Sequence, residues 1–98
     1  MNSDDLIVID LFCLHHGIEV DFIFELQSQG MIDIVEREEK KYFSVAQLVS
    51  IEKIIRLHYD LNINLEGIDV IMNLLHQMEE YQRQLQIAKN KLAFFEEE

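Results

Sequence analysis

The chain has 98 residues, of which 49% are hydrophobic, and it carries a formal net charge of −11 at pH 7. This length suffices for one small domain, or for a smaller head followed by one long helix. The negative charge is the opposite of the basic footprint that nucleic-acid binding requires, and it also opposes binding to an anionic membrane. We therefore expect a protein partner with a basic surface, and neither nucleic acid nor membrane as a partner.

The cysteine content and the N-terminal residues indicate the cellular compartment of the protein. Cys13 is the single cysteine, so no disulfide can form within the chain, and an isolated thiol is typical of a reducing environment. The chain opens with Met-Asn-Ser-Asp-Asp, which places acids where a signal peptide carries bases. No stretch is long enough to span a bilayer. We expect a cytoplasmic protein.

The first thirty or so residues predict one strand and two short helices. The β-branched run Leu6–Ile9 predicts a strand, and Asp10 follows it in the position of a helix N-cap. The first helix is expected over Leu11–His16 and the second over Val20–Gln29. Each helix is followed directly by a glycine, which is a common helix stop signal.

The next segment predicts a β-hairpin. Met31–Val35 and Lys41–Phe43 flank the polar stretch Glu36–Lys40, which is expected to be the connecting loop. Two short helices followed by such a wing are typical of a winged helix-turn-helix, whose second helix is the recognition helix. The expected fold is therefore mainly α-helical, with a winged head over residues 1–64 that includes one more helix.

The third helix begins with a capping box formed by Ser44 and Gln47, and it is expected to end near Asn62. Asn64 is then the N-cap of a long C-terminal helix over residues 65–98. Apolar residues of this helix follow the alternating spacing of a coiled coil, so we expect a homodimer, although folding back onto the head is an alternative. The expected dimer seam consists of Ile71, Leu74, Met78, Tyr81, Leu85, Ala88, Leu92 and Phe95.

The expected recognition helix has no basic residue. Its only charges are Asp21 and Glu25, whereas a DNA-reading helix uses Lys and Arg to neutralise phosphates. Val20 and Phe24 extend the apolar arc of this helix beyond what burial on one side requires. These four residues are the candidate partner-binding patch, and the alternative is that Val20 and Phe24 are simply core residues.

Each candidate for enzyme chemistry has a simpler structural explanation. Cys13 and His16 could supply two metal ligands, but no further ligands follow at a recognisable spacing. His76 and Glu80 share a helix face without the HExxH motif of a zinc protease. The glutamates within residues 36–39 are better explained as a solvated hairpin tip than as an acid–base pair. We expect no enzymatic activity, no cofactor and no metal.

Three segments resemble the CbpM family of bacterial chaperone modulators, which are relatives of the MerR-type winged helix-turn-helix. They are FCLHHGI at Phe12–Ile18, QGMI at Gln29–Ile32, and IIRLHYDLNINLEGIDVIMNLL at Ile54–Leu75. The resemblance extends from about Leu6 to Phe95. It implies a small cytoplasmic protein that binds the J-domain of the DnaJ-like co-chaperone CbpA and thereby blocks its action on the chaperone DnaK.

A MerR-family DNA-binding transcriptional regulator is the alternative function. The architecture favours it, as does the small basic cluster Arg37, Lys40 and Lys41 in the expected wing. The net charge and the acidic second helix oppose it, and fold alone does not determine function. His58, within the RLH string, could face either the core or a partner.

Overall fold

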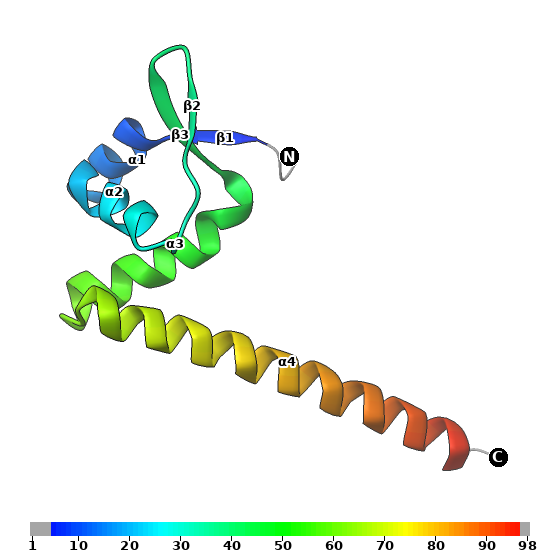
Figure 1. Ribbon diagram of the computed structural model, residues 1–98. Coiled ribbons are helices and arrows are strands. Elements are labelled where there is room, and N and C mark those ends of the chain that lie inside the picture. Colours follow the sequence, from blue (N-terminus) through cyan, green and yellow to red (C-terminus); the bar gives the residue numbers. More distant parts are fainter. Residues whose placement is uncertain (1–4, 97–98) are drawn as a thin grey trace. The chain divides into compact units, whose positions relative to one another are not determined.

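In the computed structural model, which describes residues 5–96, the chain divides into two compact units, Met1–Leu65 and Glu66–Glu98. The first unit is a mainly helical head with a small sheet and the second is helical, so the predicted fold class is confirmed (Figure 1). In chain order the elements are β1 (Leu6–Val8), α1 (Ile9–His16), α2 (Val20–Ser28), β2 (Val35–Arg37), β3 (Lys40–Ser44), η1 (Val45–Gln47), α3 (Leu48–Ile55), η2 (Arg56–Asp60) and α4 (Leu65–Glu96).

The sheet is antiparallel, with strand order β1-β3-β2, so the first strand pairs with the far strand of the wing. Ile7 lies opposite Phe43, whose side chain is fully buried, and Glu36 lies opposite Lys41. Opposite charges at directly paired positions stabilise an antiparallel ladder. By pairing with β3, β1 connects the wing to the helical part of the head, which contributes most of the core.

The wing has a shorter loop than expected. The predicted loop Glu36–Lys40 is mostly strand, and only Glu38 and Glu39 form the turn, both in the left-handed region at φ 52° and 67°. The prediction was wrong because charged side chains were taken as a sign of a loop. Since the tip of this hairpin is exposed on both faces, charged residues are compatible with a strand there.

The predicted roles of Asp10 and Gln47 at helix starts also differ from the structure. α1 begins at Ile9 with Val8 as its N-cap, so Asp10 lies in the first turn of the helix. Its carboxylate there is attracted by the positive end of the helix dipole and still stabilises the helix. Ser44 caps as expected and accepts a hydrogen bond from the Ala46 N–H at 3.1 Å. The Gln47 amide instead bonds the backbone N–H and C=O of Asp33, at 2.8 and 2.9 Å, and holds the segment before β2.

The core of the head lies among α1, α2, α3 and β3. Phe12 of α1 meets the buried Phe43 of β3 edge-on, with 5.0 Å between ring centroids, a geometry that aromatic pairs favour. Aliphatic side chains that are fully or almost fully buried complete this core, and they come from all three helices: Ile9, Ile23, Leu26, Ile51 and Ile54. This packing places the exposed side of α2 on the surface of the head.

The end of α3 widens into a π-helical turn, η2. The main chain then reverses at Asn62, which has a φ of 56°. The His58 Nδ1–H donates to the Ile63 carbonyl at 2.9 Å, and the Ile63 N–H donates to the Leu57 carbonyl at 3.1 Å. Helical structure therefore ends near Asn62, as predicted, but its last turn is of a type that is rare and often found at functional sites.

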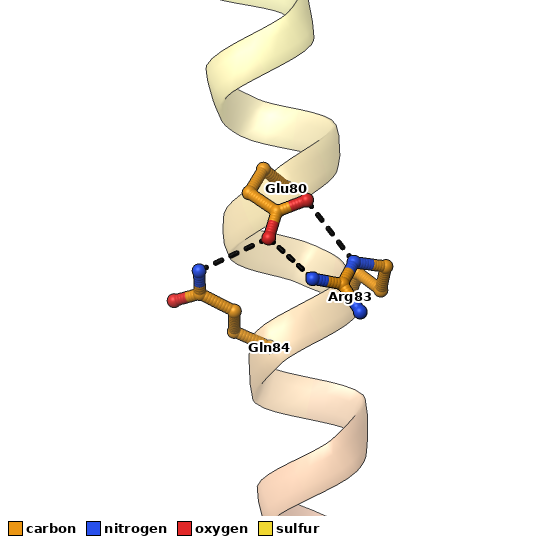
Figure 2. Close-up of polar contacts among 3 residues, drawn as sticks. All are labelled: Glu80, Arg83 and Gln84. Carbon is orange, nitrogen blue, oxygen red and sulfur yellow. Dashed lines mark hydrogen bonds and ion pairs between the residues drawn. The ribbon is translucent and has the colours of Figure 1, made fainter.

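α4 carries a polar cluster on its surface. Figure 2 shows Glu80 hydrogen-bonded to Arg83, with 3.0 Å between Nε and Oε2, and to Gln84, at 3.1 Å. These hydrogen bonds lower the pKa of the Glu80 carboxyl to about 2, with Arg83 as the larger cause. No helix within residues 5–96 is both long and apolar enough to cross a membrane.

Candidate functional site

The face of α2 that would meet DNA in a winged helix-turn-helix is acidic. Phe22, Ile23 and Leu26 are buried, whereas Asp21 and Glu25 are exposed. Glu19, the N-cap residue of α2, is exposed as well. The helix therefore presents only negative side-chain charge to solvent, which would repel phosphates and attract a basic protein surface.

The two candidate apolar anchors, Val20 and Phe24, are half-buried. The Lys41 Nζ of the wing lies 4.5 Å from the centroid of the Phe24 ring, a cation–π contact that joins the wing to α2. One of the three wing bases is thus directed at the protein's own aromatic side chain. The Phe24 ring is therefore partly exposed to solvent, and Lys41 lies over its face.

Sequence reasoning missed an aromatic cluster between α2 and η2. The His58 ring stacks on the buried Phe22 ring at 4.6 Å, which settles the open question of where His58 faces. Tyr59 meets the Phe22 and His58 rings edge-on at 5.3 and 4.9 Å, yet its side chain remains 46% exposed. In a regular α-helix, consecutive residues such as His58 and Tyr59 point to different sides, so helical spacing does not predict that both contact Phe22. The cluster became evident only with the π-helical turn of the structure.

The hydroxyl of Tyr59 interacts with the start of α2. The pKa of Tyr59 is raised, mainly because the side chain is partly buried; a hydrogen bond from the Glu19 backbone lowers it, and the ionisable groups of Glu19, Cys13 and Glu25 raise it by smaller amounts. The start of α2 and η2, which are distant in sequence, thus lie together in the head.

Cys13 and His16, which were considered as possible metal ligands, have separate surroundings in the structure. Cys13 is buried, which raises the pKa of its thiol, helped by the negative charge of Asp10. His16 stacks on Phe12 at 4.1 Å, and its Nε2 lies 3.7 Å from a Glu52 carboxylate oxygen. Within residues 5–96, no group of three or more His, Cys, Asp or Glu side chains could hold a metal ion.

A shallow cavity of about 290 Å³ lies beside His16 on the surface of the head, lined also by Val49, Glu52, Ile55 and Arg56 of α3 and η2. Its lining mixes one carboxylate, one guanidinium and two aliphatic side chains. No set of polar groups converges in it as a specific small-molecule site requires.

The predicted seam of α4 is exposed along most of its length. Ile71 is half-buried, whereas the six large side chains after it expose between 52% and 68% of their surface: Leu74, Met78, Tyr81, Leu85, Leu92 and Phe95. Ala88 is exposed too. The predicted seam thus lies on the exposed surface of α4 in the single chain.

Comparison with known proteins agrees with this architecture. Residues 7–90 match the family described as MerR HTH family regulatory protein. The chain is also 20% identical to the chaperone modulatory protein CbpM of Pseudomonas entomophila (strain L48), and the similarity covers 97% of each chain. The resemblance predicted from the three sequence segments is confirmed.

Proposed function

Since the chain belongs to the MerR HTH regulatory family and is similar over its length to a chaperone modulatory protein, we propose that it is a protein-binding modulator of a DnaJ-like co-chaperone. In this proposal it binds the J-domain of the co-chaperone and blocks its action on DnaK. The observation that carries the proposal is the acidic, base-free α2 in the position of a recognition helix.

The proposed surface consists of Asp21, Glu25, Val20 and Phe24. J-domains are expected to expose a basic helical face, which complements the two carboxylates and the net charge of −11. Charged groups at the rim of an interface mainly set the association rate, whereas desolvated aromatic side chains hold the complex together. The acids would therefore steer the J-domain, and the exposed part of Phe24 would anchor it.

Charge reversal tests this surface. The double variant Asp21→Lys with Glu25→Lys should slow association with a purified J-domain and flatten its dependence on salt, as measured by stopped-flow binding. Because both side chains are exposed, thermal stability should change little. Reversal of the two glutamates at the wing turn, Glu38→Lys with Glu39→Lys, makes the same change in net charge elsewhere and serves as the control.

The possible outcomes separate the alternatives. Unaltered binding by a folded double variant would move the interface away from α2. Equal slowing by the wing control would mean that net charge alone, and no particular surface, governs association. A wild-type chain that binds no J-domain would refute the proposal as a whole.

We also propose that the chain is a homodimer through the seam of α4. We infer that a second copy of the chain covers the seam, because the seam residues repeat with coiled-coil spacing. The same helix of a second copy can therefore pack against them in the knobs-into-holes manner of a coiled coil. The exposed leucine, tyrosine and phenylalanine side chains of the seam supply the apolar surface that such pairing buries.

DNA-binding regulation is the second candidate function, favoured by the family match. Its basic residues would have to come from the wing, where Arg37 and Lys40 are exposed and Lys41 contacts Phe24. Basic side chains gain affinity for DNA by neutralising phosphates and releasing their counterions. Because this wing has few bases and lies in the same head as the acidic α2, the affinity for a duplex should be low.

A further inference from the structure

The Phe24 ring of α2 holds a cation in the single chain. The Lys41 Nζ of β3 lies 4.5 Å from the centroid of this ring, within the roughly 6 Å that a cation–π contact allows. The cation comes from another element of the head, so the contact is a tertiary one and not a consequence of helical spacing. An ammonium group seated on the ring shows which chemistry the ring accepts, namely the positive end of a lysine or arginine side chain.

The lysine on this ring is exchangeable. Lys41 is exposed, and within residues 5–96 it is part of no ion pair. A cation–π contact at an exposed site changes an equilibrium constant only about 2- to 5-fold. Glu36 lies directly opposite Lys41 in the β2–β3 register, so a carboxylate is within reach of the ammonium group once that group leaves the ring.

The ring also belongs to the acidic surface of α2. Asp21 is exposed and precedes Phe24 by three positions, so the two side chains are neighbours on the helix. Glu25, which is exposed as well, follows Phe24 directly in the chain. A basic helix that approaches these carboxylates therefore brings its cations close to the ring. Because a lysine of the partner offers the ring the same ammonium group as Lys41 does, the two compete for one place.

We propose that the face of the Phe24 ring is a subsite for a lysine or arginine side chain of the partner protein, and that Lys41 fills this subsite until the partner displaces it. The proposal rests on the proposed function and deepens it, since it names the type of side chain that the α2 surface receives. It also gives the wing a role in binding. Lys41 opposes the partner, so its removal should strengthen the complex.

Substitutions in the wing test this competition. Lys41→Gln removes the competing cation, whereas Lys40→Gln makes the same change in net charge at the neighbouring position, whose side chain points to the other face of the sheet. Lys41→Gln should bind a J-domain about 2- to 5-fold more tightly than Lys40→Gln does. Lys41→Arg should bind as the wild type does, because arginine also covers an aromatic ring. Equal affinities of the two glutamine variants would overturn the proposal.

A double-mutant cycle assigns the effect to the ring. Phe24→Leu keeps an apolar side chain on α2 but removes the aromatic face, and thermal unfolding checks that each variant is folded. In this background Lys41→Gln and Lys40→Gln should bind equally tightly, since neither lysine then has a ring to cover. An advantage of Lys41→Gln that persists without the ring would mean that Lys41 opposes the partner in another way, and it would contradict the subsite.

NMR on the wild-type chain separates failure of the subsite from failure of the proposed function. The ring should shift the signals of the Lys41 ε-methylene protons upfield in the single chain, and saturation with a J-domain should return them towards their ordinary position. If a J-domain binds and these signals stay shifted, the subsite fails and the proposed function stands. The second probe is a helical peptide with arginine along one face. If this peptide returns the signals and no J-domain binds, the proposed function fails and the subsite stands. If neither probe returns the signals, the subsite is refuted.

Discussion

Replacement of Leu85 by glutamate is the sharpest test of the proposed dimer seam. Leu85 occupies a seam position of α4 and is 56% exposed in the single chain. Full burial of a leucine contributes about 1.5–3 kcal/mol, so burial of the exposed part contributes roughly 0.8–1.7 kcal/mol per chain. Two copies in one dimer therefore supply roughly 2–3 kcal/mol of association free energy.

The glutamate adds a second cost to the lost apolar burial. A carboxylate in the seam must be desolvated without a partner in each chain, which costs at least about 1 kcal/mol per copy. The sum is roughly 4 kcal/mol, which corresponds to about a thousandfold weaker dimer. Sedimentation velocity at micromolar concentrations should thus show dimer for the wild type and monomer for Leu85→Glu.

Asn90→Glu is the matched control for this variant. It introduces the same charge into α4, but residue 90 lies on the side of the helix opposite the seam. The control should remain dimeric, with helical content equal to that of Leu85→Glu by circular dichroism. A wild-type chain that sediments as a monomer at tens of micromolar, or a Leu85→Glu variant that stays dimeric, would refute the seam.

Three further predictions concern the wing, the polar cluster of α4 and DNA. The double variant Glu38→Asn with Glu39→Gly should raise the free energy of unfolding of the head by about 1–2 kcal/mol, as measured by thermal unfolding. Both positions have a left-handed backbone conformation, which asparagine and glycine adopt with less strain than glutamate. An unchanged stability would mean that the turn is unstrained. The Glu80 carboxyl, whose pKa is about 2, should contribute its full stabilisation above its ordinary pKa of 4.5 and lose it as the pH falls towards 2. NMR titration should find this depressed midpoint in the wild type and a higher midpoint, still below the ordinary value, in Arg83→Gln, because the hydrogen bond from Gln84 remains. Mobility-shift assays at physiological salt should detect no binding of genomic DNA fragments below micromolar protein, and a salt-sensitive, sequence-selective shift would favour the DNA-binding alternative instead.

Local signals predicted most of the secondary structure correctly. The glycines after α1 and α2 mark helix ends because Gly17 and Gly30 both take positive φ, at 67° and 75°. The apolar spacing of α3 and α4 is a property of neighbouring turns of one helix, so it can be read without knowledge of the rest of the chain. The strand boundaries of the wing were less accurate, since charged residues on an exposed hairpin do not distinguish strand from loop.

The candidate site was predictable only in part. The charges and spacing of α2 indicated the acidic face that Asp21 and Glu25 form. The role of Gln47 could not be deduced from sequence, because a capping box and a long-range bond to Asp33 use the same side-chain amide. Lys41 was counted as a wing base available to DNA, and its contact with Phe24 depends on how the wing packs against α2.

The acidic character of the chain, the family resemblance and the apolar repeat of α4 follow from the amino-acid sequence alone, because each is a property of composition or of local order along the chain. The packing of Tyr59 and His58 against Phe22 became evident only in the folded chain. The physical reason is that a π-helical turn changes which side chains share a face, and the packing of η2 against α2 joins residues that are some forty positions apart in the chain.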